Sequence, residues 1–484
     1  AEAKIWLRLN METLQRTANR GSVSTGYDID NSVKLEDANS EWFYNASPTA
    51  GNRRTYTFSF WIKRTEIGLV NASGNAFVIG QGQHGRMYFG GDYFQYRFDD
   101  GHDCRNVSRQ FRDTSAWYHF VVAVDTNQSS ASNRVKLYVN GESLAVDDHD
   151  GGSFPDIQDE GAFFSTSYLT LGTAPFGGSY NAGDGDYDMS GYLAEFCAVD
   201  GQQLTPTDFG EFDSNSGIWK PIDVSGLTFG SQGFYLNFAT AGDLGDDKSG
   251  NGKDLTENNL TAVDQATDVP SNNFCTLNPL MANAGPANYL PITEGGTKAV
   301  NAAAAYKIAN STIGVTSGKW YWEVKATDVN GVTAIGVTMP YYWDTDYTLG
   351  GCVYYAQGPQ RYNNSSAGSF GATYTDGDII SFALDMDATT PTMTVYKNNS
   401  SQGNLFNGLS INGAGAAFLP PKEDGYFPKV VGYNANTFEC NFGGYTSFSI
   451  SSAASDENGY GTFEYAPPSG YYALCTKNLA EFGG

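Results

Sequence analysis

An acidic run in the first half of the chain has the residue types and spacing of a metal site. In GDGDYDMS, Asp184, Asp186 and Asp188 alternate, and Glu195 follows at the spacing of a twelve-residue calcium loop, whose carboxylate oxygens bind Ca²⁺. Position six is Met189, where an EF-hand requires Gly. The run therefore predicts either Ca²⁺ at the rim of a β-structure, with no other cofactor expected, or a solvated acidic loop. Weaker candidates of this kind are Asp99, Asp100 and Asp103, and Asp147, Asp148 and Asp150.

A second candidate site is the aromatic run MPYYWDTDYTLGG in the second half of the chain. Aromatic faces stack on the apolar faces of sugar rings, and neighbouring carboxylates accept hydrogen bonds from sugar hydroxyls. The run therefore predicts a ligand-binding loop. The alternative is that these aromatic residues belong to a core or an interface. The residues concerned are Tyr341, Tyr342, Trp343, Asp344, Asp346 and Tyr347.

The elements that must position these residues are β-strands. The chain holds 57 Gly, 31 Tyr and 30 Phe, and only 17% of its residues are charged. Aromatic residues favour half-buried pleated strands, and Gly supplies turns with positive φ. In RTYTFSFWIKR, Tyr56, Phe58 and Phe60 alternate with polar residues and Trp61, as expected for a strand. The composition and this alternation predict an all-β protein.

The strand motifs between residues 25 and 212 occur in a recognisable order. After RTYTFSFWIKR come AWYHFVVAVD, RVKLYVNG, YLTLG and GYLAEFCAVDG. The pair Asn140-Gly141 is a strong hairpin signal. This order resembles the concanavalin A-like superfamily in its laminin G-like branch. The resemblance implies a jelly-roll β-sandwich.

A second set of motifs occupies residues 301–450. SGKWYWEV (Ser317 to Val324) is followed by GVTAIGVT, GDIISFALDMD, VYKNN, YFPKVV and CNFGG. Their order resembles the SPRY family, which implies a second antiparallel β-sandwich that binds ligands on its loops. The run Ser401 to Gly425 departs from the family as a long insertion rich in Gly, Ala and Asn, and long loops are often functional.

The remaining segments complete the expected organisation. Residues 1–24 alternate Ile5, Leu7 and Leu9 as an edge strand would, although a helix or a disordered tail is also open; we expect a docking arm. Residues 213–300 form an irregular bridge in which Phe234, Leu236 and Phe238 predict one strand. Residues 451–484 are aromatic and Pro-rich, and we expect them to wrap back onto the second sandwich.

Charge and cysteine content exclude several classes of protein. The formal net charge of −25 opposes binding to nucleic acid or to an anionic membrane surface. No apolar run approaches the roughly 20 residues that span a bilayer, and the first residues, AEAKIWLRLN, do not have the form of a signal peptide. The six Cys form no C-x-x-C pair, so we expect small buried side chains rather than a disulfide framework, and the redox compartment stays open.

Catalytic residues are not evident. The concanavalin A-like superfamily includes glycoside hydrolases, which need two carboxylates flanking the scissile bond, but the chain has no E-x-D-x-E run. Glu195 stands alone in its strand, and His119 lies within AWYHFVV, where a structural histidine is expected. Neither G-x-S-x-G nor H-E-x-x-H occurs. The sequence therefore predicts a protein that is not an enzyme.

The combination of both sandwiches, with NNFCTLNP between them and PPSGYYALCTKNL after them, resembles bacteriophage tail-fibre or virion surface proteins. This resemblance implies a virion-surface protein that binds host glycans, contacts other virion proteins through its N-terminal arm and forms a homotrimer. A structural capsid decoration or tail protein that makes protein contacts is the alternative, and a glycan depolymerase is a third possibility.

Overall fold

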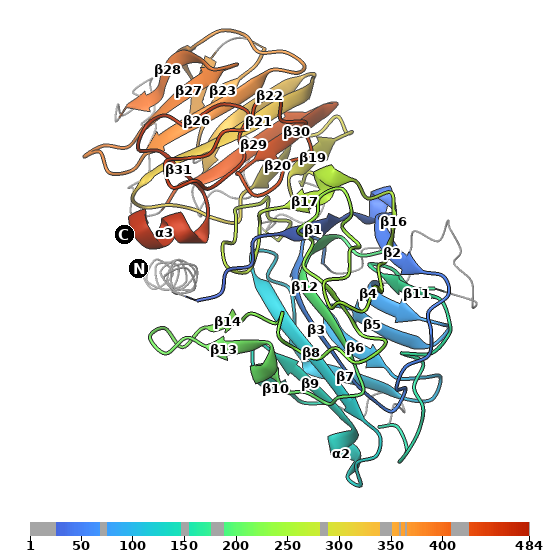
Figure 1. The fold of residues 1–484 in the computed structure, drawn as a ribbon. Coiled ribbons are helices and arrows are strands. Elements are labelled where there is room, and N and C mark those ends of the chain that lie inside the picture. The colour runs from blue at the N-terminus through green and yellow to red at the C-terminus, as the bar shows by residue number, and fades with distance from the viewer. Residues whose placement is uncertain are drawn as a thin grey trace. The chain divides into compact units, whose positions relative to one another are not determined.

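The computed structural model describes residues 26–67, 75–146, 154–175, 188–280, 289–338, 351–357, 360–363, 365–407 and 425–483. The chain divides into two compact units, Ser24–Ser271 and Asn272–Gly484. Figure 1 shows that β-sheets dominate both units, as predicted. Among the described residues, no helix has the length and hydropathy of a membrane-spanning segment.

The first unit is a sandwich of two antiparallel sheets. One sheet has the strand order β10 (Glu142–Leu144), β9 (Val135–Val139), β8 (Trp117–Asp125), β3 (Thr55–Arg64), β12 (Gly191–Asp200), β1 (Ser32–Leu35) and β17 (Gln265–Ala266), and β15 (Phe234–Leu236) also pairs with β12. The other has the order β16 (Thr256–Asn258), β2 (Trp42–Asn45), β11 (Leu169–Leu171), β4 (Asn75–Gln81), β5 (Gly85–Gly90), β6 (Tyr93–Arg97) and β7 (Asp103–Gln110).

The alternation of residues in β3 and β8 builds the core of this sandwich. Phe58, Phe60 and Ile62 from β3 and Phe120 from β8 face the other sheet and are buried. Trp61, on the opposite face of β3, is buried as well. β3 is therefore buried on both faces, and a second layer must cover its outer face. The residues after β12 provide this layer.

Residues after β12 form that covering layer. Val121 and Cys197 on the outer face of the first sheet join Phe209, Val224 and Tyr235 in a second apolar cluster. The segment also contains a small hairpin of β13 (Gly210–Phe212) and β14 (Trp219–Pro221). Short helices of this unit are η1 (Asp37–Asn39), α2 (Ala131–Arg134), η2 (Pro206–Asp208) and η3 (Ala262–Asp264).

The second unit is also a sandwich of two sheets. Its larger sheet has the order β18 (Ile292–Thr293), β19 (Lys298–Asn301), β30 (Asn436–Asn441), β21 (Lys319–Val329), β26 (Ile379–Asp385), β27 (Thr392–Lys397) and β28 (Ser400–Asn407), with β31 (Tyr472–Ala473) parallel to β21. The other has the order β20 (Lys307–Asn310), β29 (Phe427–Tyr433), β22 (Val332–Thr338), β23 (Gly351–Tyr355), β24 (Gln360–Asn363) and β25 (Ser365–Ser369). Helix α3 (Thr476–Phe482) lies near the C-terminus.

Two tight hairpins have the geometry that their sequences indicate. Asn140 and Gly141 have φ values of 48° and 79° between β9 and β10, and Asn398 and Asn399 have 45° and 65° between β27 and β28. Two central residues with positive φ match the right-handed twist of the flanking strands. The second hairpin corrects one expectation. Residues 401–407, expected to begin a long insertion, lie in β28; residues 408–424 lie outside the described residues.

The segment 213–300, treated above as a bridge, is shared between the two units, since residues up to Ser271 belong to the first. The predicted strand around Phe234 is β15, which pairs with β12. Two buried ion pairs hold the residues just before Ser271 to the first sandwich. Lys34 lies 2.9 Å from Asp264, and Lys63 lies 2.6 Å from Asp268. All six Cys are buried, as expected for small apolar side chains.

Candidate functional site

Of the site residues predicted from the sequence, Asp188 lies within the described part of the chain. Tyr341, Tyr342, Trp343, Asp344, Asp346 and Tyr347 lie outside the described residues, as do Asp184 and Asp186. Asp188 is described and is only 5% exposed. Burial raises the pKa of its carboxyl to about 6, a hydrogen bond with Thr173 lowers it, and the charge of Asp37 raises it. Asp188 therefore lies within electrostatic reach of another carboxylate.

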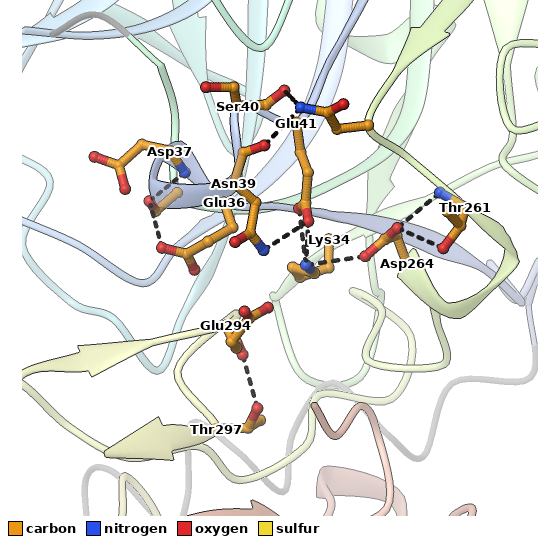
Figure 2. A network of polar contacts seen from close by, with 12 residues as sticks. Lys34, Glu36, Asp37, Asn39, Ser40, Glu41, Thr261, Asp264, Glu294 and Thr297 are labelled. Atoms are coloured by element: carbon orange, nitrogen blue, oxygen red, sulfur yellow. Dashed lines mark hydrogen bonds and ion pairs between the residues drawn. The ribbon is translucent and has the colours of Figure 1, made fainter. Parts of the chain in front are cut away.

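That carboxylate belongs to an acidic cluster at the ends of β1 and β3. Glu36, Asp37 and Glu66 each bring one ligand oxygen within 4.8 Å of the others. Figure 2 shows Glu36 and Asp37 side by side in the chain after Lys34. Ser190 donates to Glu36 Oε1 at 3.4 Å and accepts from the Asp37 backbone N–H at 3.2 Å. This arrangement offers hard oxygen ligands of the kind that Ca²⁺ prefers.

Glu66 is the least satisfied member of this cluster. Its Oε2 is buried and has no hydrogen-bond partner among the described residues. Burial, and then the charge of Asp37, raise the pKa of its carboxyl to about 7. A hydrogen bond with Ser190 and the charge of Arg64 lower this pKa. A buried oxygen such as Oε2, which has no donor, is costly, and a bound cation would give it a partner.

The weaker acidic candidates separate in the structure. Asp99 lies with His102 and Asp159, whose ligand atoms come within 4.8 Å of one another, but Asp103 instead accepts from the Tyr88 hydroxyl at 3.4 Å. Asp100 pairs with Arg97 at 3.1 Å. The run Asp147, Asp148 and Asp150 lies outside the described residues.

A cavity of about 210 Å³ opens in the first sandwich, where β2 and β4 end and β11 begins. Its lining combines aromatic and aliphatic side chains with amides, hydroxyls and one lysine. The lining residues are Asn45, Ser47, Pro48, Thr49, Phe58, Gln81, Phe164, Leu169, Gln232, Phe234, Gly252, Lys253, Asp254 and Leu255. Ligand pockets of larger organic molecules are usually above about 300 Å³, so this cavity suits a single small ring.

One wall of the cavity is a loop fixed by a buried carboxylate. Asp247 Oδ1 accepts from the backbone N–H groups of Tyr235 at 2.9 Å and Ser249 at 2.8 Å. Its Oδ2 accepts from the Lys253 N–H at 2.9 Å. The Asn251 side chain donates to the carbonyls of residues 230 and 233 at 2.6 and 2.9 Å. The motif SGNGKD therefore forms a preorganised loop that presents Lys253 and Asp254.

Gln81 fixes another part of the cavity lining. Its Oε1 accepts from the Phe164 N–H at 2.7 Å, and its Nε2 donates to the carbonyls of Ser165 and Ser167 at 2.9 and 3.1 Å. The rings of Phe58 and Phe164 lie 5.7 Å apart beside the cavity. An apolar surface with a polar rim can bind a sugar ring, which has an apolar face and hydroxyls at its edge.

Glu195, the isolated glutamate of its strand, is held by two tyrosines. It has φ of 48° at a bulge in β12 and is 5% exposed. Tyr235 donates to its Oε2 at 2.5 Å and Tyr27 to its Oε1 at 3.2 Å. Burial raises the pKa of its carboxyl to about 7. A carboxyl enclosed in this way does not face a substrate.

His119 is a second buried side chain of a type used in catalysis. Its contacts determine which imidazole nitrogen carries the proton. The indole N–H of Trp219 donates to Nδ1 at 3.0 Å, so Nδ1 is the acceptor and Nε2 carries the proton. Nε2 therefore donates to Ser59 Oγ at 2.8 Å, the reverse of what activation of a serine requires. Burial lowers the pKa of the imidazole to about 3.

Sequence reasoning missed the cavity because six separated segments supply its lining. The Gly and Asp of SGNGKD are typical turn residues, but nothing in this motif indicates which strands lie near it.

Each of the two sandwiches matches the model of a known protein family. Residues 30–201 match the laminin G family model described as "Concanavalin A-like lectin/glucanases superfamily", and residues 319–445 match the SPRY domain model. No curated protein matches the chain.

Two solved structures are similar to parts of the chain. The SPRY domain of human HERC1 is 21% identical, with a TM-score of 0.26, over 30% of this chain and 89% of that one. A candidate carbohydrate-binding protein from Bacteroides ovatus is 16% identical, with a TM-score of 0.31, over 48% of this chain and 61% of that one. The family assignments rest on the two family models: the chain contains a concanavalin A-like domain followed by a SPRY domain.

Proposed function

We propose that this protein binds glycans, and that its concanavalin A-like domain takes one sugar ring into the cavity lined by Gln81 and the SGNGKD loop. The observation that carries the proposal is the lining of the cavity, in which Phe58, Phe164 and Phe234 lie beside amide, hydroxyl and ammonium groups. The family model that matches residues 30–201 is described by a superfamily that includes lectins, and this match supports the same proposed function.

The proposed activity is binding without hydrolysis. Glycoside hydrolysis needs two carboxylates that reach the scissile bond from either side. Asp254 is the carboxylate in the cavity lining, and the buried Glu195 is engaged by two tyrosine hydroxyls. Release of reducing ends from a bound polysaccharide would contradict this part of the proposal.

The binding site is tested by substitutions in its rim. We expect Gln232→Ala and Lys253→Ala each to weaken binding at least about fivefold, since a polar contact to a ligand contributes about 1–3 kcal/mol. The ligand is first identified on a glycan array, and its affinity is then measured by titration calorimetry. Gln202→Ala and Lys136→Ala are matched controls, because both residues lie outside the cavity lining. Equal affinity in all four variants would place the site elsewhere, and substitutions in the segment around Trp343 would then be tested.

Ca²⁺ is the proposed cofactor, bound by Glu36, Asp37 and Glu66 with Asp188 nearby. Support comes from the short distances between the ligand oxygens and from the unpartnered Oε2 of Glu66. We expect Ca²⁺ to raise the melting temperature of the protein, and Glu66→Gln to abolish that shift while the exposed Glu142→Gln retains it. The same shift in both variants would exclude this cluster.

The proposed biological setting is the surface of a virion, where the protein attaches the particle to host glycans as a homotrimer. This finer proposal rests on the resemblance of the domain order to tail-fibre proteins. Purified protein should coat host cells and block phage adsorption, and light scattering should give three chains per particle. If the protein neither binds cells nor blocks adsorption, a structural role in the capsid or tail takes precedence; several hundred copies per particle would support that role.

A further inference from the structure

A buried cluster of three charged side chains lies in the concanavalin A-like domain, away from the cavity lining. The Lys34 ammonium lies 2.7 and 2.9 Å from the two Glu41 carboxylate oxygens and 2.9 Å from Asp264 Oδ1. The Lys34 side chain is 1% exposed, and those of Glu41 and Asp264 are each 5% exposed. Figure 2 shows the Lys34 side chain ending between the two carboxylates. The three groups are therefore held together with almost no access to water.

Neighbouring groups fix both carboxylates. Asn39 Nδ2 donates to Glu41 Oε1 at 2.9 Å. Asp264 Oδ2 accepts from the Thr261 N–H at 2.8 Å and from the Thr261 hydroxyl at 3.2 Å, in a capping box at the start of η3. The two oxygens of Asp264 therefore differ, because one faces the amine and the other faces two donors (Figure 2).

The charges of the cluster do not balance in their usual ionisation states. One ammonium between two carboxylates leaves a net negative charge in a dry environment, which favours a proton on one carboxyl. Burial raises the pKa of the Glu41 carboxyl, the charge of Lys34 lowers it, and the charge of Asp264 raises it. The raised pKa makes Glu41 the carboxyl of the cluster that can hold and pass on a proton.

We propose that Lys34 and Asp264 join in an intramolecular isopeptide bond after folding, and that Glu41 transfers the protons. The Lys34 ammonium passes one proton to Asp264 Oδ1, 2.9 Å away, and the resulting amine attacks Cγ of Asp264, forming the N–C bond. The negative charge develops on Oδ2, where the Thr261 N–H and hydroxyl stabilise it. Glu41, in its carboxylic acid form, gives its proton to the Oδ1 hydroxyl and takes one proton from nitrogen, so the C–O bond breaks, water leaves and Glu41 is again protonated. One amine and one carboxylic acid thus give one amide and one water, without a further reactant.

Asp264 supplies the carbon that the amine attacks, because its two oxygens have different partners and its carboxyl is therefore polarised. Glu41 contacts the amine through both oxygens, which suits a group that accepts one proton and returns it. Fixed geometry in a dry site can replace an external activating agent, since the effective molarity of well-oriented groups is very high. Lys63 and Asp268 form a second buried pair, with Lys63 Nζ 2.6 Å from Asp268 Oδ2. This pair serves as an internal comparison for the proposed cross-link. There Asp268 Oδ1 accepts from the Trp117 indole at 3.1 Å.

The test is the mass of the intact full-length protein. We expect it to lie below the mass calculated from the sequence by one water, and a tryptic digest to contain a branched peptide joining Lys34 to Asp264. Trypsin should not cleave after Lys34. A mass equal to the calculated value, with separate peptides for the two residues, would overturn the proposal. A branch from Lys34 to Glu41, or from Lys63 to Asp268, would also overturn it.

Variants separate the roles of the three residues. Glu41→Gln keeps the size of the side chain and should restore the missing water to the mass, as should Asp264→Ala. Asp268→Asn removes the comparison pair and should leave the cross-link intact. Circular dichroism establishes that each variant is folded, and the mass of the unsubstituted protein decides the proposal whatever the variants do. Persistence of the cross-link in folded Glu41→Gln would refute the role of Glu41.

Discussion

At the level of single residues, burial moves the pKa values of acids and bases in opposite directions. Glu195 and His119 lie on the outer side of the same sheet, in β12 and β8. Burial raises the pKa of Glu195 to about 7 and lowers that of His119 to about 3, because it disfavours the charged form of each. Each group thereby makes the stability of its unit depend on pH.

We expect Glu195→Gln to remove part of this pH dependence. The folded pKa of Glu195, about 7, exceeds its ordinary value of 4.5, so the folded state holds the proton more tightly. Its contribution to stability is complete below pH 4.5 and is lost as the pH rises through 7, which amounts to at most about 3 kcal/mol. Urea unfolding at pH 5, 6, 7 and 8 measures this loss.

The glutamine variant keeps an uncharged side chain at the position, so its unfolding free energy should fall less between pH 5 and pH 8 than that of the unsubstituted protein. Parallel pH profiles for the two proteins would show that Glu195 does not titrate in this range. The exposed Glu142→Gln serves as the control, because its profile should match that of the unsubstituted protein.

At the level of elements, one buried glutamate joins the C-terminal segment to the SPRY domain. Glu323 of β21 is fully buried. It accepts from the Tyr321 hydroxyl at 2.9 Å and from the backbone N–H groups of Glu464 and Tyr465, each at 2.9 Å. Asn441 Nδ2 donates to it at 3.1 Å. Four donors to one carboxylate hold the segment after residue 460 on β21, and β31 then pairs with the same strand.

We expect Glu323→Ala to destabilise the SPRY domain by about 3–5 kcal/mol, because four buried donors lose their acceptor. Glu323→Gln should cost less, since its amide oxygen still accepts. Urea denaturation followed by tryptophan fluorescence measures both. The matched control is Glu481→Ala at an exposed position. A loss below about 1 kcal/mol in Glu323→Ala would mean that the segment is held by its apolar contacts alone.

At the level of the whole molecule, each compact unit has its own apolar core. Phe60 and Phe120 belong to the core of the first unit, and Trp322 and Phe382 to that of the second. All four side chains are at most 1% exposed. Separate cores of this size are the usual mark of domains that fold independently.

We therefore expect two thermal transitions that respond to different substitutions. Phe120→Ala and Phe382→Ala should each lower one transition, with a loss of about 3–5 kcal/mol for a truncated core phenylalanine. Differential scanning calorimetry of the full chain distinguishes them. One transition that both substitutions lower equally would show that the two units unfold as one.

The cross-link proposed for Lys34 and Asp264 acts at this scale too. It would close a loop containing most of the first unit, and closing a loop of more than 100 residues is worth roughly 5 kcal/mol in the chain-entropy estimate used for disulfides. The first transition of Glu41→Gln should then lie below that of the unsubstituted protein by more than the loss of one buried contact explains.

The sequence alone indicated the central strands, the two tight hairpins and the family that each sandwich resembles. Period-two alternation in β3 and the pairs Asn140-Gly141 and Asn398-Asn399 are local signals, because side-chain direction and turn geometry depend on near neighbours. The buried state of His119 and the six cysteines followed from the same apolar strands.

Only the tertiary structure decided which distant residues meet. The cavity, the Glu36, Asp37 and Glu66 cluster and the Lys34, Glu41 and Asp264 cluster each join segments that are far apart along the chain. Their proximity depends on sheet order and register, and on the return of residues 213–271 to the first sandwich. Strand pairing between distant segments has no local sequence signal, since any alternating strand can pair with any other, and the order is selected by packing of the complete core.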